Sequence, residues 1–254
     1  MGGATGGVLL SLIGSMFSFA VAAGAFLFST CAMWLAKHRI TTPQHTADSP
    51  GGNWLEVLRE FSALPKVVAL LLVGADFVTI AGFTVALAPL VHEIFGNTMW
   101  LGILDALFAA GAIAISFLNP SSRTDIVSLR RTISYGYAIQ IIGLLCICFG
   151  VLWDVAGAVG TCMGSVVLGS GMALSSSQQV SFLQSSVDTK AVGKTGALRQ
   201  AVIGITTTAA LPLVGILIEV SLIAAYLGIA AFLALCFLLN VVLLQRERRA
   251  VALG

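Results

Sequence analysis

Residues 67–91 read VVALLLVGADFVTIAGFTVALAPLV, and this stretch decides the class of fold. A membrane-spanning helix needs about 20 consecutive, mostly apolar residues. The stretch exceeds that length, and Asp76 is its only ionisable residue. Membrane-spanning β-strands would instead alternate apolar and polar residues over about 10 positions. Because this stretch is apolar on every face, it predicts a transmembrane α-helix.

The composition of the whole chain points the same way. Of its 254 residues, 58% are apolar and 9% are charged, and the mean hydropathy is +1.00. A soluble domain carries roughly 25% charged residues. The composition therefore excludes a water-soluble globule, a disordered tail, a coiled coil and a nucleic-acid-binding module. The sequence predicts an all-α membrane protein with the lipid bilayer as its surroundings.

Apolar runs of the same kind predict seven transmembrane helices. They are Ser15–Leu35, Val67–Val91, Met99–Leu118, Ile133–Leu152, Val155–Leu174, Ala197–Ile218 and Ser221–Leu244. The chain thus divides into an N-terminal stub with a lead helix (1–36), a cytoplasmic linker (37–66) and a six-helix bundle with a basic tail (67–254). Within the linker, Asn53 and Glu56 form a capping pair, and Pro65 ends an amphipathic helix expected on the inner membrane face. A solvated turn is the alternative for this segment.

The basic residues follow alternate spans. They form four groups, after the first, third, fifth and seventh spans: Lys37, Arg39, Arg59 and Lys66; Arg123, Arg130 and Arg131; Lys190, Lys194 and Arg199; Arg246, Arg248 and Arg249. These groups contain all 13 Lys and Arg residues of the chain. Cytoplasmic loops carry the excess of Lys and Arg in membrane proteins. The pattern predicts a multi-pass protein of the cell (inner) membrane, with its N-terminus outside and its C-terminus in the cytoplasm.

Ionisable residues inside spans are costly and are candidates for function. Asp76 lies about 15 Å into its span, near the middle of the bilayer. Asp105 lies a few residues into the next span, and adjacent antiparallel helices could bring the two to similar depths. Either carboxyl group could bind and release a proton as its access to solvent changes. For both, the alternatives are a protonated carboxyl group hydrogen-bonded to a neighbouring helix and one that faces a wet crevice without a role. Gln140 is a weaker candidate for the same cavity, and a hydrogen bond between helices is its alternative.

Several chemistries lack the residues they need. No Lys lies within a span, which excludes a retinal Schiff base, and no HExxH or GxxxxGK[ST] motif occurs. The five cysteines lie inside spans without the spacing of a metal site or a disulfide framework. We therefore expect no enzyme activity, no cofactor and no metal.

The order of helices from Gly6 to Val242 resembles the major facilitator superfamily, and most closely its bacterial drug- and siderophore-efflux members. Gly6–Gly14 resembles the outer end of the fifth helix of that family, and Ser15–Leu35 resembles the sixth. Trp54–Phe61 resembles the helix that joins the two halves of such a transporter. Leu168–Ala173 resembles the Gly-rich tenth helix, and Val187–Lys194 resembles the loop after it.

The resemblance also has departures. Residues 119–131 occupy the place of the charged G-x-x-x-D-R-x-G-R-R/K loop but lack its glycines. Arg123, Asp125, Arg130 and Arg131 are the candidates for its gating charges. Superfamily members have two six-helix halves with the substrate between them. The chain matches only the C-terminal half with one preceding helix.

The resemblance implies a secondary transporter, or half of one. Such a protein would move a small amphipathic molecule by proton-coupled alternating access, as in efflux by proton antiport. Its partner would be a second copy or a complementary N-terminal half, with no role for nucleic acid. The alternatives are a non-transporting scaffold or assembly subunit of the membrane, and a truncated reading frame. The sequence names neither the substrate nor the direction of transport.

Overall fold

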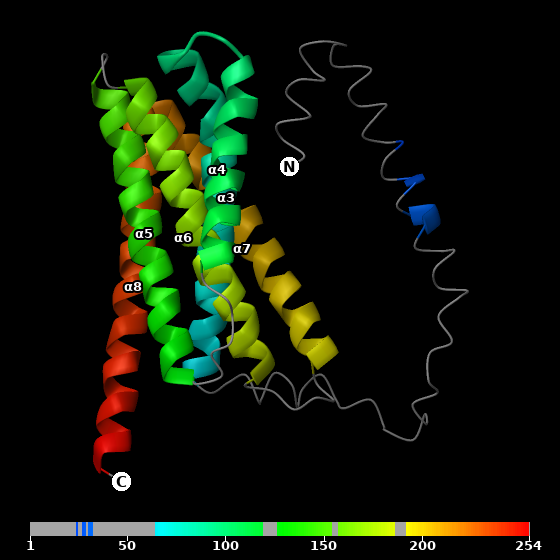
Figure 1. Cartoon of the computed structure of the whole chain (residues 1–254), viewed down its shortest axis with the longest axis vertical. Coiled ribbons are helices and arrows are strands. Elements are labelled where there is room, and N and C mark those ends of the chain that lie inside the picture. The colour runs from blue at the N-terminus through cyan, green and yellow to red at the C-terminus, as the bar shows by residue number, and fades with distance from the viewer. Residues whose placement is uncertain are drawn as a thin grey trace.

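The computed structural model describes residues 24, 27, 28, 30–32, 64–118, 126–153, 157–185 and 192–253. Six long helices contain most of these residues (Figure 1): α3 (Leu64–Ile94), α4 (Met99–Leu118), α5 (Ile126–Leu152), α6 (Gly157–Ser185), α7 (Val192–Val220) and α8 (Leu222–Leu253). All six are long and apolar enough to cross a membrane. The chain is therefore a multi-pass α-helical membrane protein, and the six predicted spans after residue 66 are confirmed as helices.

The first predicted span and the linker helix fall largely outside the described residues. The isolated positions that are described between 24 and 32 are helical, and Leu27 and Phe28 are exposed. The first span, the linker helix and the resemblance to a transporter half all remain predictions.

Consecutive helices run in opposite directions, so α3, α5 and α7 all begin at the same end of the bundle (Figure 1). We call this the basic end, because the described Lys and Arg side chains all belong to the first turns of α5 and α7 or the last turns of α8: Arg130, Arg131, Lys194, Arg199 and Arg246. Trp100 and Trp153 lie at the opposite end, where they stack on Phe95 and Phe149. Aromatic residues are enriched at membrane interfaces. The sequence predicts that the basic end faces the cytoplasm.

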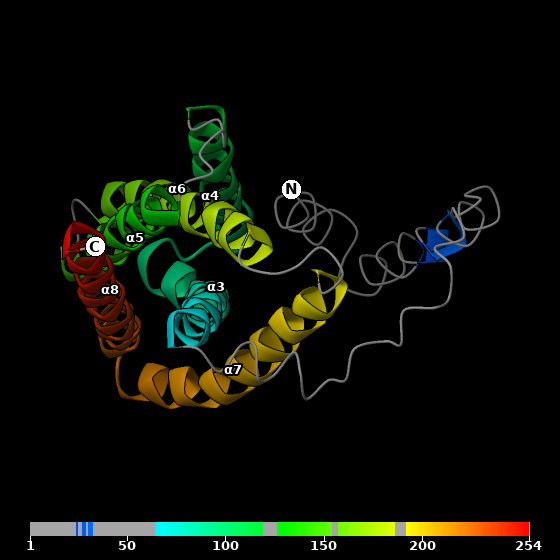
Figure 2. The ribbon, with the colours of Figure 1, turned by 90° about the horizontal axis from the view of Figure 1, so that it is seen from below.

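Helix α3 lies inside an arc formed by the other five helices (Figure 2). Along the arc, α4 packs on α6, α6 on α5, α5 on α8, and α8 on α7, while α3 contacts α6, α7 and α8. Buried side chains of α3, such as Leu72, Phe83 and Leu90, form one cluster with buried residues of the surrounding helices. This central position takes Asp76 out of contact with lipid.

Pairs of glycines hold α5 against α6 at three levels. They are Gly136 with Gly171, Gly143 with Gly164 and Gly150 with Gly157, and we call them the glycine seam. A Cβ atom at Gly136 would lie 2.8 Å from the Gly171 carbonyl oxygen, and a Cβ atom at Gly171 would lie 2.7 Å from the Gly136 carbonyl oxygen. In the other two pairs the corresponding distances are between 2.7 and 3.0 Å. Small residues let helix backbones approach in a membrane, where dispersion contacts drive association.

Helices α4 and α6 touch in the same way. A Cβ atom at Gly169 would overlap the Phe108 carbonyl oxygen, and one at Gly111 would overlap the Val166 carbonyl oxygen. The Ser170 hydroxyl donates a hydrogen bond to the Gly111 carbonyl oxygen across this contact. Helices α4, α5 and α6 therefore form one closely packed layer, with α6 in the middle.

The turn between α3 and α4 is tight. Gly96 has a φ of 62°, and its N–H group donates to the Val91 carbonyl oxygen, which ends α3. Many helices end at a residue in the left-handed conformation, and glycine adopts this conformation without a steric penalty. The Asn97 side chain then accepts a hydrogen bond from the Met99 N–H group and caps α4.

Every one of these six helices except α4 is longer than its predicted span. Helix α5 begins at Ile126 rather than Ile133, and α6 extends to Ser185 rather than Leu174. The added part of α6 contains the polar tract from Ser175 to Gln179. Three of its five residues, Ser175, Gln178 and Gln179, are buried in the bundle. An apolar-run criterion ends a span at such a tract, because it scores exposure to lipid and not contact with another polar side chain.

Candidate functional site

The Asp76 side chain lies at the centre of the bundle and is fully buried. Three side chains from two other helices donate hydrogen bonds to its carboxylate group. The Gln140 amide in α5 donates to Oδ1 at 2.8 Å, and the Gln179 amide in α6 donates to Oδ2 at 2.8 Å. The Ser175 hydroxyl in α6 lies 2.9 Å from Oδ1 and 2.8 Å from Oδ2. The network thus joins α3 to both α5 and α6.

A second set of contacts closes the network. The remaining amide N–H of Gln140 donates to the Ser175 hydroxyl oxygen at 2.9 Å. The remaining amide N–H of Gln179 donates to the Tyr137 hydroxyl oxygen at 2.8 Å. Tyr137 in turn donates to the Leu72 carbonyl oxygen at 2.6 Å, one turn before Asp76 in α3. We call these five side chains, Asp76, Tyr137, Gln140, Ser175 and Gln179, the Asp76 network.

Counting donors shows which charge state of Asp76 the network fits. An ionised carboxylate only accepts hydrogen bonds, and an amide NH₂ group offers two donors. Each N–H and O–H group of the other four side chains has an acceptor when Asp76 is ionised. Three donors directed at one carboxylate stabilise its charge in the absence of water, and such charge-assisted bonds are the stronger kind.

The network also fits a protonated Asp76. The Ser175 hydroxyl oxygen lies 3.0 Å from the Met172 carbonyl oxygen of its own helix. If the Ser175 hydroxyl group turns to donate to that carbonyl oxygen, its own oxygen can accept a hydrogen bond from the O–H group of protonated Asp76. One hydroxyl rotation therefore gives the carboxyl group hydrogen-bond partners in both charge states. The arrangement is suited to taking up and releasing a proton without breaking apart.

Other titratable groups also face Asp76. The charge of the Arg199 guanidinium in α7 acts on Asp76. Asp76 in turn acts on the Tyr137 hydroxyl group and on the Cys236 thiol in α8. The Arg199 guanidinium lies 5.6 Å from the centre of the Phe77 ring, beside Asp76 in the chain. Helices α5, α6 and α7 therefore contribute charge or hydrogen bonds around one carboxyl group.

Asp105, the second predicted carboxyl group, lies elsewhere. It is the seventh residue of α4, whereas Asp76 is 18 residues before the end of α3, so their heights differ by roughly 18 Å of helix rise. Asp105 is partly exposed and has no hydrogen bond to any residue that the structure describes. The expectation that the two carboxyl groups lie at similar depths is wrong, because Asp105 is too close to the turn at Gly96.

Two of the candidate gating charges differ in their surroundings. Arg130 is buried at the start of α5, and its guanidinium lies 5.1 Å from the centre of the Phe182 ring of α6. Arg131 is exposed and donates a hydrogen bond to the Tyr135 hydroxyl oxygen one turn along its own helix. Arg123 and Asp125 lie outside the described residues.

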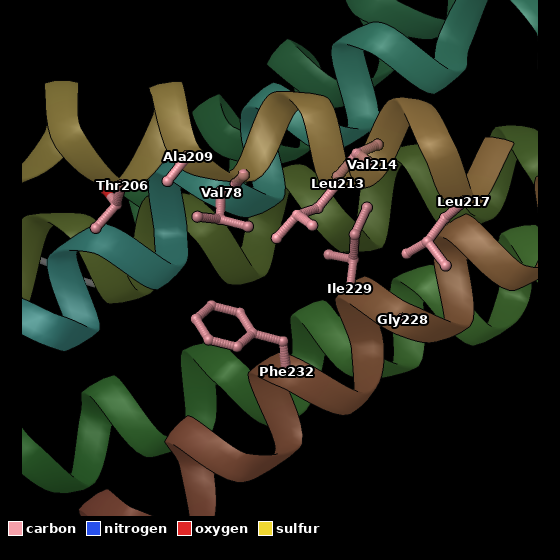
Figure 3. Close-up of a pocket in the computed structure, with 10 residues that line it drawn as sticks. Val78, Thr206, Ala209, Leu213, Val214, Leu217, Gly228, Ile229 and Phe232 are labelled. Carbon is pink, nitrogen blue, oxygen red and sulfur yellow. The ribbon is translucent and has the colours of Figure 1, made fainter.

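A separate apolar groove lies between α7 and α8, with Val78 of α3 at its floor (Figure 3). Its volume is about 350 Å³. Apart from Thr206, only apolar residues line it, and Leu213 and Phe232 are exposed at its rim. Ligand pockets of roughly 300–1,000 Å³ are usually lined in this way.

The sequence identified Asp76 and Gln140, but Tyr137, Ser175 and Gln179 were missed as site residues. The signal for the last two is the polar tract from Ser175 to Gln179, which follows directly on the apolar run that ends at Leu174. A helix that continues for several turns beyond Leu174 places this tract at the depth of Asp76. No group of three or more metal-ligating His, Cys, Asp or Glu side chains occurs among the residues described.

Removing the Tyr137 hydroxyl group tests the network. In Tyr137→Phe, the Leu72 carbonyl oxygen and one Gln179 N–H group lose their partner. We expect a loss of about 1–2 kcal/mol in stability, measured by thermal unfolding in detergent. Tyr135→Phe is the matched control, because Tyr135 is exposed and bonds only Arg131. Equal stability of the two variants would contradict the geometry given for Tyr137.

Comparison with known proteins adds no family: no family model, no curated protein and no solved structure matches this chain.

Proposed function

We propose that the chain is a secondary transporter, or one half of such a transporter. It moves a small amphipathic molecule across the cell membrane by alternating access, with Asp76 as the site that binds the coupled proton. The observation that carries this proposal is the Asp76 network: a carboxyl group within a membrane span, fully buried in the bundle, with hydrogen-bond partners for that group in both charge states. Intramembrane carboxyl groups with such partners mark proton relays in pumps and transporters.

Two further features support transport. The apolar groove between α7 and α8 has a size and lining that suit the apolar part of a small molecule. Binding sites in secondary transporters lie near the bilayer midplane, and Asp76 has about that depth in α3. The order of the predicted helices resembles one half of a major facilitator transporter, which would act with a second copy or with a separate N-terminal half.

Uptake into proteoliposomes tests this proposal. The chain is reconstituted alone and together with any product encoded by the adjoining upstream DNA. An imposed proton gradient is then applied with a panel of fluorescent amphipathic dyes. We expect dye flux that follows the proton gradient and is lost when a protonophore collapses it. Transport would be contradicted if the proteoliposomes, with or without the second product, showed no more flux than empty liposomes.

A non-transporting membrane subunit is the second candidate function. The observation in its favour is that every donor of the Asp76 network already has a partner, as expected of polar side chains that only hold helices together. A stable stoichiometric complex with an enzyme or pigment protein, isolated in mild detergent, is the expected result for such a subunit. A protein that transports by itself would contradict it.

A further inference from the structure

A small cavity lies between the last turns of α6 and the first turns of α7, at the basic end of the bundle. Its volume is about 200 Å³. Apolar and polar groups line it together: Val180, Leu183, Gln184, Thr195, Gly196 and Arg199. It differs in this respect from the groove between α7 and α8, which is almost wholly apolar.

Arg199 is the charged group of this cavity. Its Nε atom is buried and has no hydrogen-bond partner among the residues that the structure describes. The guanidinium packs over the ring of Phe77, which covers one of its faces. A guanidinium group carries five N–H donors and cannot lose its charge in a protein. A buried donor without a partner is unusual in a native protein, so the Nε atom marks a candidate position for an acceptor group.

Asp76 does not supply the missing acceptor. It acts on Arg199 electrostatically, but its two oxygens accept their hydrogen bonds from Gln140, Ser175 and Gln179. The other acidic side chains that the structure describes, Glu93, Asp105 and Glu219, belong to the opposite end of the bundle. Within the described part of the chain, the cavity therefore presents a positive charge with no hydrogen-bonded counter-ion.

We propose that this cavity binds an anionic group, a carboxylate or a phosphate, against the Arg199 guanidinium. The planar fork of Arg donates two parallel hydrogen bonds to either group. The Thr195 and Gln184 side chains line the same cavity and offer polar surface beside it. The proposal rests on the proposed function in one respect: it gives the amphipathic substrate an anionic head. The same chemistry is found in the headgroup of an anionic lipid.

Binding is tested without transport, on purified full-length protein in neutral detergent. The probes are benzoate and inorganic phosphate, each compared with neutral benzamide at equal ionic strength. The readout is the midpoint of thermal unfolding followed by tryptophan fluorescence, since a ligand that binds the folded state stabilises it. We expect at least one anion to raise the midpoint of the wild type in a saturable manner. We expect benzamide to have no effect.

Three variants make the test specific. In Arg199→Gln the affinity for the anion is expected to fall roughly tenfold to a hundredfold, as for loss of a charged hydrogen bond. Arg199→Lys keeps the charge but not the planar fork, so it should bind the anion more weakly than the wild type. This variant also tests the proposal if Arg199→Gln does not fold. Arg131→Gln is the matched control, because Arg131 is exposed at the same end of the bundle. It should bind like the wild type.

A second arm separates the two sources of the anion. The protein is placed in nanodiscs of phosphatidylcholine alone or with phosphatidylglycerol. Stabilisation by phosphatidylglycerol that depends on Arg199, without any effect of benzoate or phosphate, identifies a lipid headgroup as the anion. Anion responses that are identical in the wild type and both Arg199 variants would overturn the proposal. Binding that persists in a protein without transport would contradict the proposed function alone.

Discussion

Asp76→Asn is expected to abolish proton-coupled flux while leaving the protein folded. Asparagine has nearly the same shape as aspartate, but it cannot take up a proton. Its NH₂ group would meet the amide donors of Gln140 or Gln179. Both glutamines have a buried side-chain oxygen without a hydrogen-bond partner among the described residues. A flip of one amide group lets its oxygen accept from the new NH₂ group, at the cost of that amide's bond to Tyr137 or Ser175. The substitution therefore removes the charge and the proton site with little change in packing.

The measurement is gradient-driven dye flux in proteoliposomes, together with the thermal midpoint in detergent. We expect flux at the level of empty liposomes and a midpoint close to that of the wild type. Asp105→Asn is the matched control, since Asp105 lies outside the network, and it should retain flux. Wild-type flux in Asp76→Asn would remove Asp76 from the coupling mechanism. A non-functional Asp105→Asn would show that the proton site was assigned to the wrong carboxyl group.

Gly169→Ala is expected to have the largest effect on folding. The added methyl group would overlap the backbone carbonyl group of Phe108 in α4. Backbone cannot rotate away as a side chain can, so α4 and α6 must separate. Overpacking of a core costs about 1–3 kcal/mol and occasionally more, and we expect the upper part of this range. Gly111→Ala should behave alike, because its methyl group would overlap the Val166 carbonyl group.

Gly215→Ala provides a control with the opposite sign. Gly215 lies inside α7, and no atom lies within 4 Å of the position that its Cβ would take. Alanine is a better helix former than glycine by about 0.5–1 kcal/mol. Thermal unfolding in detergent should therefore show a lower midpoint for Gly169→Ala and an equal or higher one for Gly215→Ala. Equal midpoints in the two variants would contradict the close contact of α4 and α6.

The six helices after residue 66 could be predicted because each contains an apolar run longer than a membrane span. Their ends could not be predicted equally well. The run criterion found α4 at its observed bounds, since Gly96 and Asn97 mark its start. It ended α6 at Leu174, because the polar tract that follows resembles an interface. The apolar-run criterion measures preference for lipid, so it does not recognise polar residues that face other helices as part of a span.

The site was predictable only in part for the same reason. A lone carboxyl group in an apolar run identifies Asp76 from sequence. Its partners in α5 and α6 are separated from it by 64 to 103 residues, and only the packing of the bundle brings them together. The repeat of glycines at every seventh residue in both helices was the available signal for that packing. The match between the two repeats is visible only when the sequences of α5 and α6 are compared with each other.

The glycine seam has a mechanical consequence. Its three pairs recur at intervals of two helical turns, about 10.5 Å along the axis, so a shorter slide of α5 along α6 would set side chains against backbone at each level. These two helices are expected to move as one piece, with α4 attached through Gly111 and Gly169. The Asp76 network then lies across the joint between this rigid piece and α3. If Asp76 takes up a proton, three charge-assisted hydrogen bonds give way to weaker neutral ones, and the contact between α3 and this piece is expected to weaken.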